Sequence, residues 1–326
     1  MRKVKWGVLG TAGIAKRCTI PGMLLADNCE VYAIAGRSAE KVAEFVNAFG
    51  FEKGYTSYEE LLDDPEVEAV YIPLPNNLHR EWAIKALNKK KHVLCEKPIA
   101  PTAAEAEEMI AAANANGVFL MEAFAYLHSP FIQAIKDVID AGTIGKITYM
   151  ESAFLTPGYT TDNIRVRRET LGGSVYDLGC YCTSLSRWLL GEEPSEVKGA
   201  AEFTDQNIDI HTNVIMNYPS GARASVSCGM CLGGGNRIDR WNICGTKGKI
   251  VSTEQFNGDG ELKFEVYTAD GCEVKTVDTP QNYRLEVEQL GRCITDGETP
   301  FVSNEFTVSN AKIMDKILMT IGYYES

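Results

Sequence analysis

The first 124 residues alternate short apolar runs with segments of helical periodicity, and this alternation constrains the fold more than any other feature of the chain. The apolar runs lack a polar face, as expected for parallel strands that are covered on both sides. We predict strands at residues 4–9, 31–35, 69–73, 92–95 and 118–121, and helices at 40–49, 58–62, 80–88 and 103–116. Elements in this order connect by right-handed crossovers, so the sequence predicts an α/β fold with a doubly wound parallel sheet.

The pattern changes after about Phe124. A helix is predicted at residues 131–140, and a strand-rich region follows from residue 146 to about 275. Its segments alternate apolar and polar residues, which is typical of an open, mainly antiparallel sheet with one covered face. Two further helices are predicted at 283–295 and 303–324. Because the 326 residues are about twice a single-domain length of roughly 150, we predict two domains, residues 1–124 and 125–326.

Charge and hydropathy restrict the partners of the chain. The 32 Lys+Arg against 44 Asp+Glu give a net charge of −12, which repels nucleic acid and anionic lipid. The first apolar run is too short for a signal peptide, and no apolar run approaches the length of about 20 residues that spans a bilayer. We therefore expect a soluble cytoplasmic protein with no nucleic-acid or membrane partner.

The cysteines support this expectation. The ten cysteines are scattered through apolar segments, a pattern that suits reduced thiols. Only Cys228 and Cys231 have metal-like spacing, and they have neither a second pair nor a nearby histidine. Structural zinc needs four ligands, so we expect no metal site.

A glycine-containing turn follows the first predicted strand. Its residues, Gly10, Thr11, Ala12, Gly13 and Ile14, should present backbone N–H groups to a phosphate at a helix N-terminus. The segment departs from the Gly-x-Gly-x-x-Gly fingerprint at Ala12 and Ala15, but both residues are small enough for a pyrophosphate to approach. These five residues are candidate cofactor ligands, and an ordinary glycine turn is the alternative.

The second predicted strand ends in Arg37 and Ser38, without the acidic residue that binds the ribose of NAD. A guanidinium and a hydroxyl suit the 2′-phosphate of NADP instead. We therefore expect a preference for NADP, with NAD possible. A solvated Arg37 that caps the next helix is the alternative.

Two further segments follow predicted strands at the edge where open parallel sheets bind ligands. Leu74, Pro75, Asn76 and His79 are expected to line the nicotinamide half of the site, although His79 can equally cap its helix. Glu96 and Lys97 end the next strand. A desolvated lysine there can lower the proton affinity of a neighbour or donate a proton itself, and a surface lysine paired with Glu96 is the alternative.

Four segments occur in the order seen in the glucose-fructose oxidoreductase and inositol dehydrogenase (Gfo/Idh/MocA) family. They are the turn at 10–15, Glu96-Lys97-Pro98, Glu122-Ala123-Phe124, and the run at 171–181 that contains Gly172-Gly173, Asp177 and Tyr181. The chain resembles this family over nearly its whole length. The resemblance implies a Rossmann domain and a C-terminal α/β domain whose open sheet carries the substrate site on one side. It also implies an oligomer interface on the other side, so a homo-oligomer, either a dimer or a tetramer, is expected.

The resemblance also implies catalytic residues. The motif lysine of the family falls on Lys97 and its motif aspartate on Asp177, while Tyr181 stands where many members have histidine. This variant resembles the branch that holds glucose-fructose oxidoreductase, dimeric dihydrodiol dehydrogenase and NADP-linked xylose dehydrogenase. Tyr181 then looks like the general acid/base and Asp177 like the residue that orients substrate hydroxyls. The positive charge of Lys97 has to draw the tyrosine pKa, about 10 when unperturbed, toward neutrality.

A helix that starts near Asp177 would place Asp177 and Tyr181 on one face, four residues apart. Simple capping and packing roles are the alternative for both. Arg165, Arg167 and Arg168 form a local basic cluster just before the Gly172-Gly173 turn. Arg165 is a candidate ligand of the cofactor phosphates or of an acidic substrate, and a solvated turn is the alternative.

These features favour an NADP-dependent oxidoreductase that transfers a hydride between the nicotinamide and the hydroxyl or carbonyl carbon of a sugar, polyol or cyclic trans-diol. Two other hypotheses are a glycosidase that uses NAD for transient oxidation, a chemistry also found in the family, and a non-catalytic NADPH-sensing protein.

Overall fold

The structure is a computed structural model that describes residues 2–324, and the chain divides into two compact units. Unit 1 holds the described residues up to Ala100, Ala104–His128 and Pro280–Thr307. Unit 2 holds Pro101–Ala103, Ser129–Thr279 and the described residues from Val308 on. Residues 280–307 thus group with unit 1, whereas the sequence pattern placed them in the second of two continuous domains.

Unit 1 contains a parallel sheet of six strands in the order β3-β2-β1-β4-β5-β6, which confirms the predicted parallel sheet. The strands are β1 (Val4–Leu9), β2 (Cys29–Ala35), β3 (Lys53–Tyr55), β4 (Ala69–Ile72), β5 (His92–Glu96) and β6 (Leu120–Ala123). The strand order reverses between β1 and β4, and open α/β sheets bind ligands at the carboxyl ends of the strands beside such a reversal.

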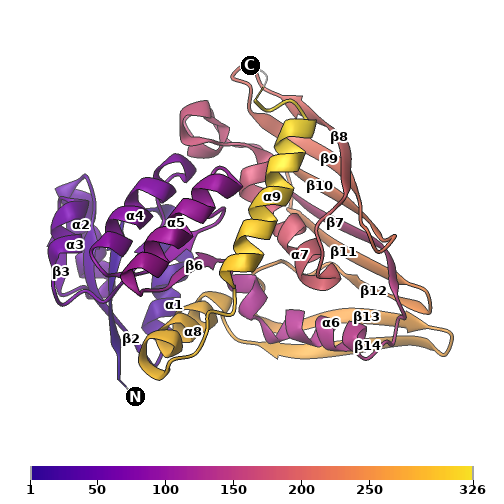
Figure 1. The fold of residues 1–326 in the computed structure, drawn as a ribbon, viewed down its shortest axis with the longest axis horizontal. Helices are drawn as coiled ribbons and strands as arrows, with labels where there is room; N and C mark the ends of the chain where they lie inside the picture. The colour runs from indigo at the N-terminus through magenta and orange to yellow at the C-terminus, as the bar shows by residue number, and fades with distance from the viewer. Residues whose placement is uncertain (1, 325–326) are drawn as a thin grey trace. The chain divides into compact units, whose positions relative to one another are not determined.

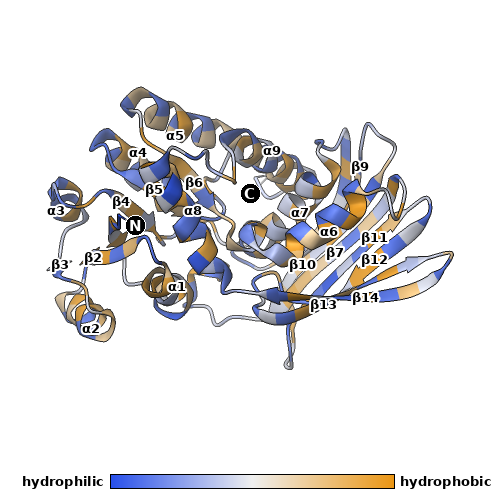
Figure 2. Ribbon diagram, turned by 90° about the horizontal axis from the view of Figure 1, so that it is seen from below, coloured by the Kyte–Doolittle hydropathy of each residue, from blue (hydrophilic) through white to orange (hydrophobic). Residues whose placement is uncertain are grey.

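Helices cover both faces of the unit 1 sheet. They are α1 (Ile20–Leu25), α2 (Ala39–Phe49), α3 (Tyr58–Asp63), α4 (His79–Asn88), α5 (Ala103–Asn116) and α8 (Asn282–Asp296). Buried residues of α3, α4 and α5, such as Leu61, Ala83 and Met109, pack in one cluster with strand residues. Figure 2 shows α1, α2 and α8 on the opposite face.

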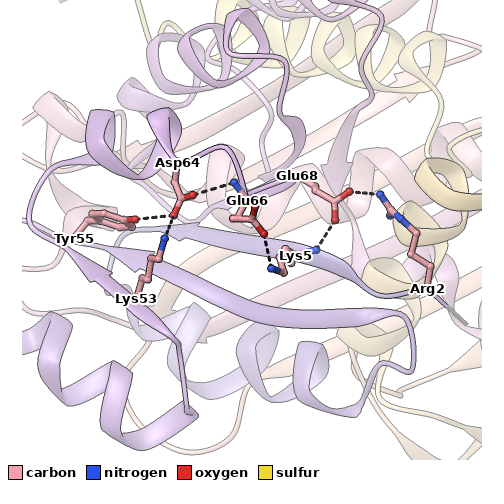
Figure 3. Close-up of polar contacts among 7 residues, drawn as sticks. All are labelled: Arg2, Lys5, Lys53, Tyr55, Asp64, Glu66 and Glu68. Carbon is pink, nitrogen blue, oxygen red and sulfur yellow. Dashed lines mark hydrogen bonds and ion pairs between the residues drawn. The ribbon is translucent and has the colours of Figure 1, made fainter.

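Charged residues connect the amino ends of three strands of unit 1 (Figure 3). Asp64 accepts hydrogen bonds from the Tyr55 hydroxyl (2.7 Å) and from Lys53 Nζ (3.0 Å), and Glu66 pairs with Lys5 Nζ at 2.7 Å. Burial works to raise the pKa of Asp64, but the hydrogen bonds from Tyr55, the Glu66 amide and Lys53 outweigh it and lower this pKa to about 2. The amino edge of the sheet is therefore held by ion pairs and hydrogen bonds within unit 1.

Unit 2 contains a sheet of eight strands in the order β14-β13-β12-β11-β7-β10-β9-β8. The strands are β7 (Ile147–Pro157), β8 (Glu196–Phe203), β9 (Asp209–Asn217), β10 (Arg223–Leu232), β11 (Ile238–Gly245), β12 (Gly248–Ser252), β13 (Gly260–Thr268) and β14 (Gly271–Thr279). Within this sheet, as described for residues 2–324, only β10 and β7 pair in parallel, and the other neighbouring strands pair antiparallel. This mixed, mostly antiparallel sheet confirms the fold class predicted for the second half of the chain.

One face of the larger sheet packs against helices. α6 (Pro130–Asp140) contacts β14, and α7 (Cys180–Leu190) contacts β7 and β10 (Figure 1). Hydrophobic and hydrophilic residues alternate along the strands (Figure 2), because alternate side chains point to opposite faces. The Phe131 ring of α6 meets the rings of Trp241 and Phe264 at centroid distances of 5.8 and 5.6 Å. The last helix is α9 (Asn304–Thr320).

None of the helices within residues 2–324 combines the length and the apolar character that a membrane span requires.

Candidate active site

The turn after β1 has the backbone expected of a phosphate-binding turn. Gly10 has a φ of +124°, and a Cβ atom there would lie 3.1 Å from the Leu74 side chain, so this position favours glycine. The Ala12 carbonyl accepts a hydrogen bond from Lys16 N at 3.1 Å, and a π-helical turn, Ala15–Thr19, leads into α1. No side chain among the described residues caps this π-helical turn. Its backbone N–H groups are suited to an anionic oxygen.

Arg37 and Ser38 lie between β2 and α2. The Ser38 hydroxyl accepts a hydrogen bond from Lys41 N at 3.3 Å and so caps α2. The Arg37 side chain is exposed, and its positive charge acts on the hydroxyl of Tyr58, whose ring packs edge-on against Trp82. Burial nevertheless raises the pKa of Tyr58. An exposed guanidinium suits the phosphorylated adenosine end of a dinucleotide.

Leu74, Pro75, Asn76 and His79 follow β4. Leu74 is buried, whereas Pro75 and Asn76 are half-buried. His79 has no exposed surface, and its Nδ1 and Nε2 atoms lie 2.8 Å and 2.7 Å from the carbonyl oxygens of Pro98 and Leu74. Burial lowers the pKa of His79, although both carbonyls work against this shift. The imidazole therefore joins the loops after β4 and β5, and the predicted contact with the nicotinamide stays a prediction.

Glu96 and Lys97 stand at the end of β5, where Lys97 is half-buried. Tyr71 donates a hydrogen bond to the Glu96 carboxylate, and Thr19 donates to the Tyr71 hydroxyl at 2.9 Å. Glu96 also accepts from the backbone N–H of Lys97 at 3.3 Å. Glu96 is thus held by Tyr71 of β4, which in turn accepts a hydrogen bond from Thr19 of the helix that follows the glycine turn.

Two buried acids surround this end of β5. Burial raises the pKa of Glu122 to about 7, against a 2.8 Å hydrogen bond from Ile99 N and the positive charge of Lys97. Glu286 of α8 is fully buried, and neither of its carboxylate oxygens has a hydrogen-bond partner among the described residues. Burial and then the charge of Glu96 raise the pKa of Glu286 well above its usual range. The sequence contained no signal for Glu286, because only the return of α8 to unit 1 brings it near Glu96.

The helix that carries Asp177 and Tyr181 begins at Ser174, three residues earlier than predicted. Asp209 of β9 explains this start, because its Oδ2 atom accepts hydrogen bonds from Val175 N (2.8 Å) and from the Ser174 hydroxyl (2.7 Å). Burial raises the pKa of Asp209 to about 6 despite these bonds. The residue replaces a local N-cap, and its distance along the chain hides it from a sequence pattern.

Asp177 and Arg165 form an ion pair within unit 2. Arg165 Nε lies 2.8 Å from Asp177 Oδ2, and the guanidinium lies 5.3 Å from the centre of the Tyr159 ring. The Gly172-Gly173 turn makes this possible, since Gly173 N donates to the Arg165 carbonyl at 2.9 Å. The structure therefore gives Arg165 a contact with the motif aspartate, and its contact with the cofactor stays a prediction.

The two other arginines of the cluster make contacts within unit 2. Arg168 donates hydrogen bonds to the carbonyls of Tyr323 (2.8 Å) and Asn207 (3.3 Å) and covers the Tyr323 ring. Arg167 is half-buried, pairs with the exposed Glu169 at 3.6 Å and donates a hydrogen bond to the Thr161 carbonyl at 3.4 Å. These contacts give Arg168 a structural role and hold Arg167 against its own loop.

Tyr181 lies in an aromatic pocket of unit 2. It is 8% exposed, and its ring meets those of Phe154 and Phe256 at 5.5 and 5.2 Å. Asn257 Nδ2 donates a hydrogen bond to the Tyr181 hydroxyl at 3.2 Å. Asn257 was missed by the sequence analysis, because it lies in a loop whose position depends on tertiary packing.

The metal-like pair Cys228 and Cys231 does not converge with other ligands. Cys228 is buried and Cys231 is exposed. Across residues 2–324 no group of three or more His, Cys, Asp or Glu side chains is arranged to hold a metal ion.

The parallel sheet, the uncapped helix start and the exposed Arg37 define the class of protein: an NAD(P)-dependent oxidoreductase with a Rossmann domain. Residues 4–124 match the model of the oxidoreductase family with an NAD-binding Rossmann fold, and residues 132–251 match the GFO/IDH/MocA C-terminal domain. The chain belongs to the GFO/IDH/MocA family, which confirms the resemblance found in its sequence motifs.

Named relatives align with nearly the full chain. D-xylose 1-dehydrogenase (NADP(+)) 2 of Haloferax volcanii is 34% identical over 316 residues, which are 96% of this chain and 95% of that protein. Trans-1,2-dihydrobenzene-1,2-diol dehydrogenase of Xenopus laevis is 32% identical, with 98% of each chain covered. A 3-ketoreductase from Actinomadura kijaniata, solved in complex with NADP and TDP-benzene, is similar with a TM-score of 0.92 and 27% identity, and 98% of each chain is covered.

Proposed function

We propose that this oxidoreductase uses NADP to oxidise or reduce a sugar, a polyol or a cyclic trans-diol at a hydroxyl or carbonyl carbon. The names of the relatives support this substrate class, since they include a xylose dehydrogenase, a dihydrodiol dehydrogenase and a 3-ketoreductase. When bound, NADP supplies or accepts the hydride at its nicotinamide ring. The remaining chemistry is the movement of one proton at the substrate oxygen, which falls to side chains of the protein.

In this proposal the cofactor lies along the carboxyl edge of the parallel sheet. The N–H groups that follow Gly10 bind the pyrophosphate, and Arg37 with Ser38 binds the 2′-phosphate. The residues Leu74, Pro75 and Asn76 line the nicotinamide half. The fit rests on two observations: the helix start after Gly10 has no side-chain cap among the described residues, and the Arg37 guanidinium is exposed.

Proton transfer is assigned to Tyr181, with Lys97 as the cation that favours loss of the phenolic proton and Asp177 as the group that orients substrate hydroxyls. The single observation that carries this assignment is the setting of Tyr181. Its hydroxyl has a polar donor, Asn257, while its ring is enclosed by aromatic side chains. A buried tyrosine that only packs in the core also needs a hydrogen-bond partner for its hydroxyl. A variant that changes the chemistry but not the packing separates the two roles.

The test replaces Lys97 with methionine, which keeps the length of the side chain and removes its charge. We expect turnover to fall by about 10²–10⁴-fold, the usual contribution of proton-transfer catalysis, while NADPH binding stays near the wild-type value. Turnover is followed by nicotinamide absorbance with pentoses, hexoses, osones and dihydrodiols, and NADPH binding by fluorescence titration. Lys136→Met, which breaks an exposed ion pair with Asp140, is the matched control. Wild-type turnover of Lys97→Met would remove Lys97 from the mechanism. Turnover of a glycoside without net absorbance change would point to transient oxidation instead.

Cofactor choice has a separate test at Arg37. A charge-assisted hydrogen bond of about 1.5–3 kcal/mol corresponds to a preference of about tenfold to a hundredfold for NADPH over NADH. Arg37→Asp removes this bond and adds repulsion, so NADPH affinity should fall far more than NADH affinity. Equal losses for the two cofactors would show that Arg37 does not bind the 2′-phosphate.

We also propose that two or more copies associate through the sheet face opposite α6 and α7. Exposed apolar side chains on three of its strands support this, namely Tyr149 (39%), Ile215 (54%) and Val274 (55%). Ile215→Glu should shift the mass measured by light scattering from a dimer or tetramer to a monomer. A wild-type mass of one chain would refute the association.

We further propose a cytoplasmic location. The ten cysteines are scattered along the chain, which suits a reducing compartment, and cell fractionation tests this location.

A further inference from the structure

The hydroxyl of Tyr181 receives a hydrogen bond from a loop that the family motifs do not include. Asn257 lies between β12 and β13, and its Nδ2 atom is 3.2 Å from Tyr181 Oη. An amide Nδ2 atom can only donate, so the tyrosine oxygen accepts this bond. The orientation matters because a donor aimed at a phenol oxygen stabilises the ionised form more than the neutral form.

Packing within unit 2 fixes the loop that presents Asn257. Gly258 N donates to the Gln255 carbonyl at 3.0 Å, which closes a tight turn around Phe256 and Asn257. The Phe256 ring stacks on Phe154 at 5.4 Å and lies 4.9 Å from the Trp241 ring. The same aromatic ring that holds the loop also contacts Tyr181, so the donor and the acceptor are positioned by one cluster.

The Asp239 carboxylate of β11 also holds the loop that carries Asn257. Phe256 N donates to Asp239 Oδ1 at 3.3 Å, and Arg237 binds both oxygens of the Asp239 carboxylate at 2.5 Å. The Arg237 guanidinium in turn covers the Phe154 ring at 4.2 Å. The loop is therefore held by a buried acid, its cationic partner and an aromatic stack, an arrangement that preorganises the Asn257 amide.

We propose that Asn257 is a positioning residue that holds the Tyr181 oxygen and stabilises it in its ionised form. The inference rests on the proposed function for its catalytic meaning, since a stabilised phenolate matters only if Tyr181 exchanges the substrate proton. The bond strengthens as negative charge develops on the oxygen, so it assists the step in which Tyr181 has given up its proton. It supplies from within unit 2 a contribution that the sequence analysis assigned to Lys97 alone.

Other titratable groups of unit 2 lie on the helix of Tyr181 and on the strands that pack against it. On the helix of Tyr181 itself, Asp177 is paired with Arg165 at 2.8 Å. Asp239 of β11 pairs with Arg237, the residue just before that strand, at 2.5 Å. The neighbouring thiols of Cys182 and Cys228 are raised in pKa by burial and stay neutral. The Asn257 variants leave these ion pairs and thiols unchanged, so a shift in the ionisation of Tyr181 reports the substituted side chain.

The experiment measures the ionisation of Tyr181 directly in the full-length protein. Tyrosine labelled with ¹³C at Cζ gives a shift that reports phenolate formation, and Tyr181→Phe assigns the resonance. We expect Asn257→Leu, which keeps the bulk and removes the donor, to raise the pH of half-ionisation by about one unit, as a tenfold change in equilibrium implies. Asn257→Asp, which is nearly isosteric but brings a negative charge, should raise it further. Asn114→Asp on exposed α5 is the charge control and should leave it unchanged.

The pH profile of kcat/KM completes the test. The pH at which kcat/KM changes with Tyr181 ionisation should shift by the same amount as the Tyr181 resonance in both Asn257 variants. The NADPH dissociation constant should stay within about twofold of the wild-type value. An unmoved resonance in both variants overturns the inference whatever the activity. A moved resonance together with an active Tyr181→Phe enzyme upholds the hydrogen bond and overturns instead the proposed role of Tyr181. Equal thermal unfolding midpoints show that the variants are folded.

Discussion

Two helix starts in this molecule have similar backbones, but the backbone N–H groups of their first turns have different hydrogen-bond partners. Each follows a glycine of positive φ, Gly10 at +124° and Gly173 at +132°, and each passes into a π-helical turn, Ala15–Thr19 and Val175–Gly179. The start in unit 2 is bonded by the carboxylate of Asp209, whereas no described side chain caps the start in unit 1. The first helix start is thus open to the anionic ligand that we propose for it, and the second is bonded by a carboxylate of the same unit.

The largest loss of stability should come from replacing Gly173, the glycine next to the Asp209 carboxylate. A Cβ at Gly173 would lie 2.1 Å from Asp209 Oδ1, whereas the nearest atom to a Cβ at Gly10 is in the flexible Leu74 side chain, at 3.1 Å. We expect Gly173→Ala to lower the free energy of unfolding by more than about 4 kcal/mol and Gly10→Ala by about 2 kcal/mol, measured by denaturant titration. Gly191→Ala, with a φ of +72° and no atom within 4 Å, isolates the backbone strain. If Gly173→Ala were as mild as this control, contact with Asp209 would not explain the glycine.

The second effect concerns the charge of Asp209. Its folded-state pKa, about 6, lies above the ordinary value of 3.8, so the folded state binds the proton more tightly than the unfolded state. The wild type should therefore lose stability relative to Asp209→Asn as the pH rises from about 4 to about 7, by about 3 kcal/mol. Urea titrations of both proteins across this pH range measure the change. The opposite trend would mean that the helix start stabilises the carboxylate more than burial destabilises it.

The smallest effect on stability, and the most direct test of the comparison, comes from giving the first helix start a carboxylate of its own. Ala12→Asp should stabilise unit 1 by about 0.5 kcal/mol through the helix dipole. The same charge repels the cofactor pyrophosphate, so NADPH affinity should fall by about tenfold or more. Ala12→Asn, which caps without charge, separates the electrostatic part. Undiminished NADPH affinity of Ala12→Asp would show that the phosphate does not bind at this turn.

The sequence predicted the elements that local patterns specify. The strands β1 and β5 were found because burial on both faces leaves continuous apolar runs. β3 was missed, since a three-residue edge strand, Lys53–Tyr55, is half exposed and leaves no such run. Lys97 was a candidate because it follows a predicted strand, and the family resemblance supported it, whereas the role of Tyr181 came from the resemblance. The structure places each on its own unit, at a strand end and on a helix, respectively.

Residues that act across long stretches of chain could not be predicted. Asp209 caps a helix that begins at Ser174, and Asn257 reaches Tyr181 only because Phe256 packs against Phe154. Nothing in the local pattern of either residue specifies its partner. A helical pattern likewise states that α8 has an apolar face but not which sheet that face covers.

The return of α8 to unit 1 has a consequence for how the protein is made. Gly22 of α1 approaches α8 so closely that a Cβ there would lie 2.8 Å from Arg284 N, and Asn28 Nδ2 donates to the Glu288 carbonyl at 2.8 Å. During synthesis on the ribosome all six strands of unit 1 emerge well before α8 does. Domains usually fold in the order of their synthesis, but the complete unit 1 includes a helix that is translated after the entire eight-stranded sheet. A graft of this half onto another protein would have to carry residues 280–307 with it.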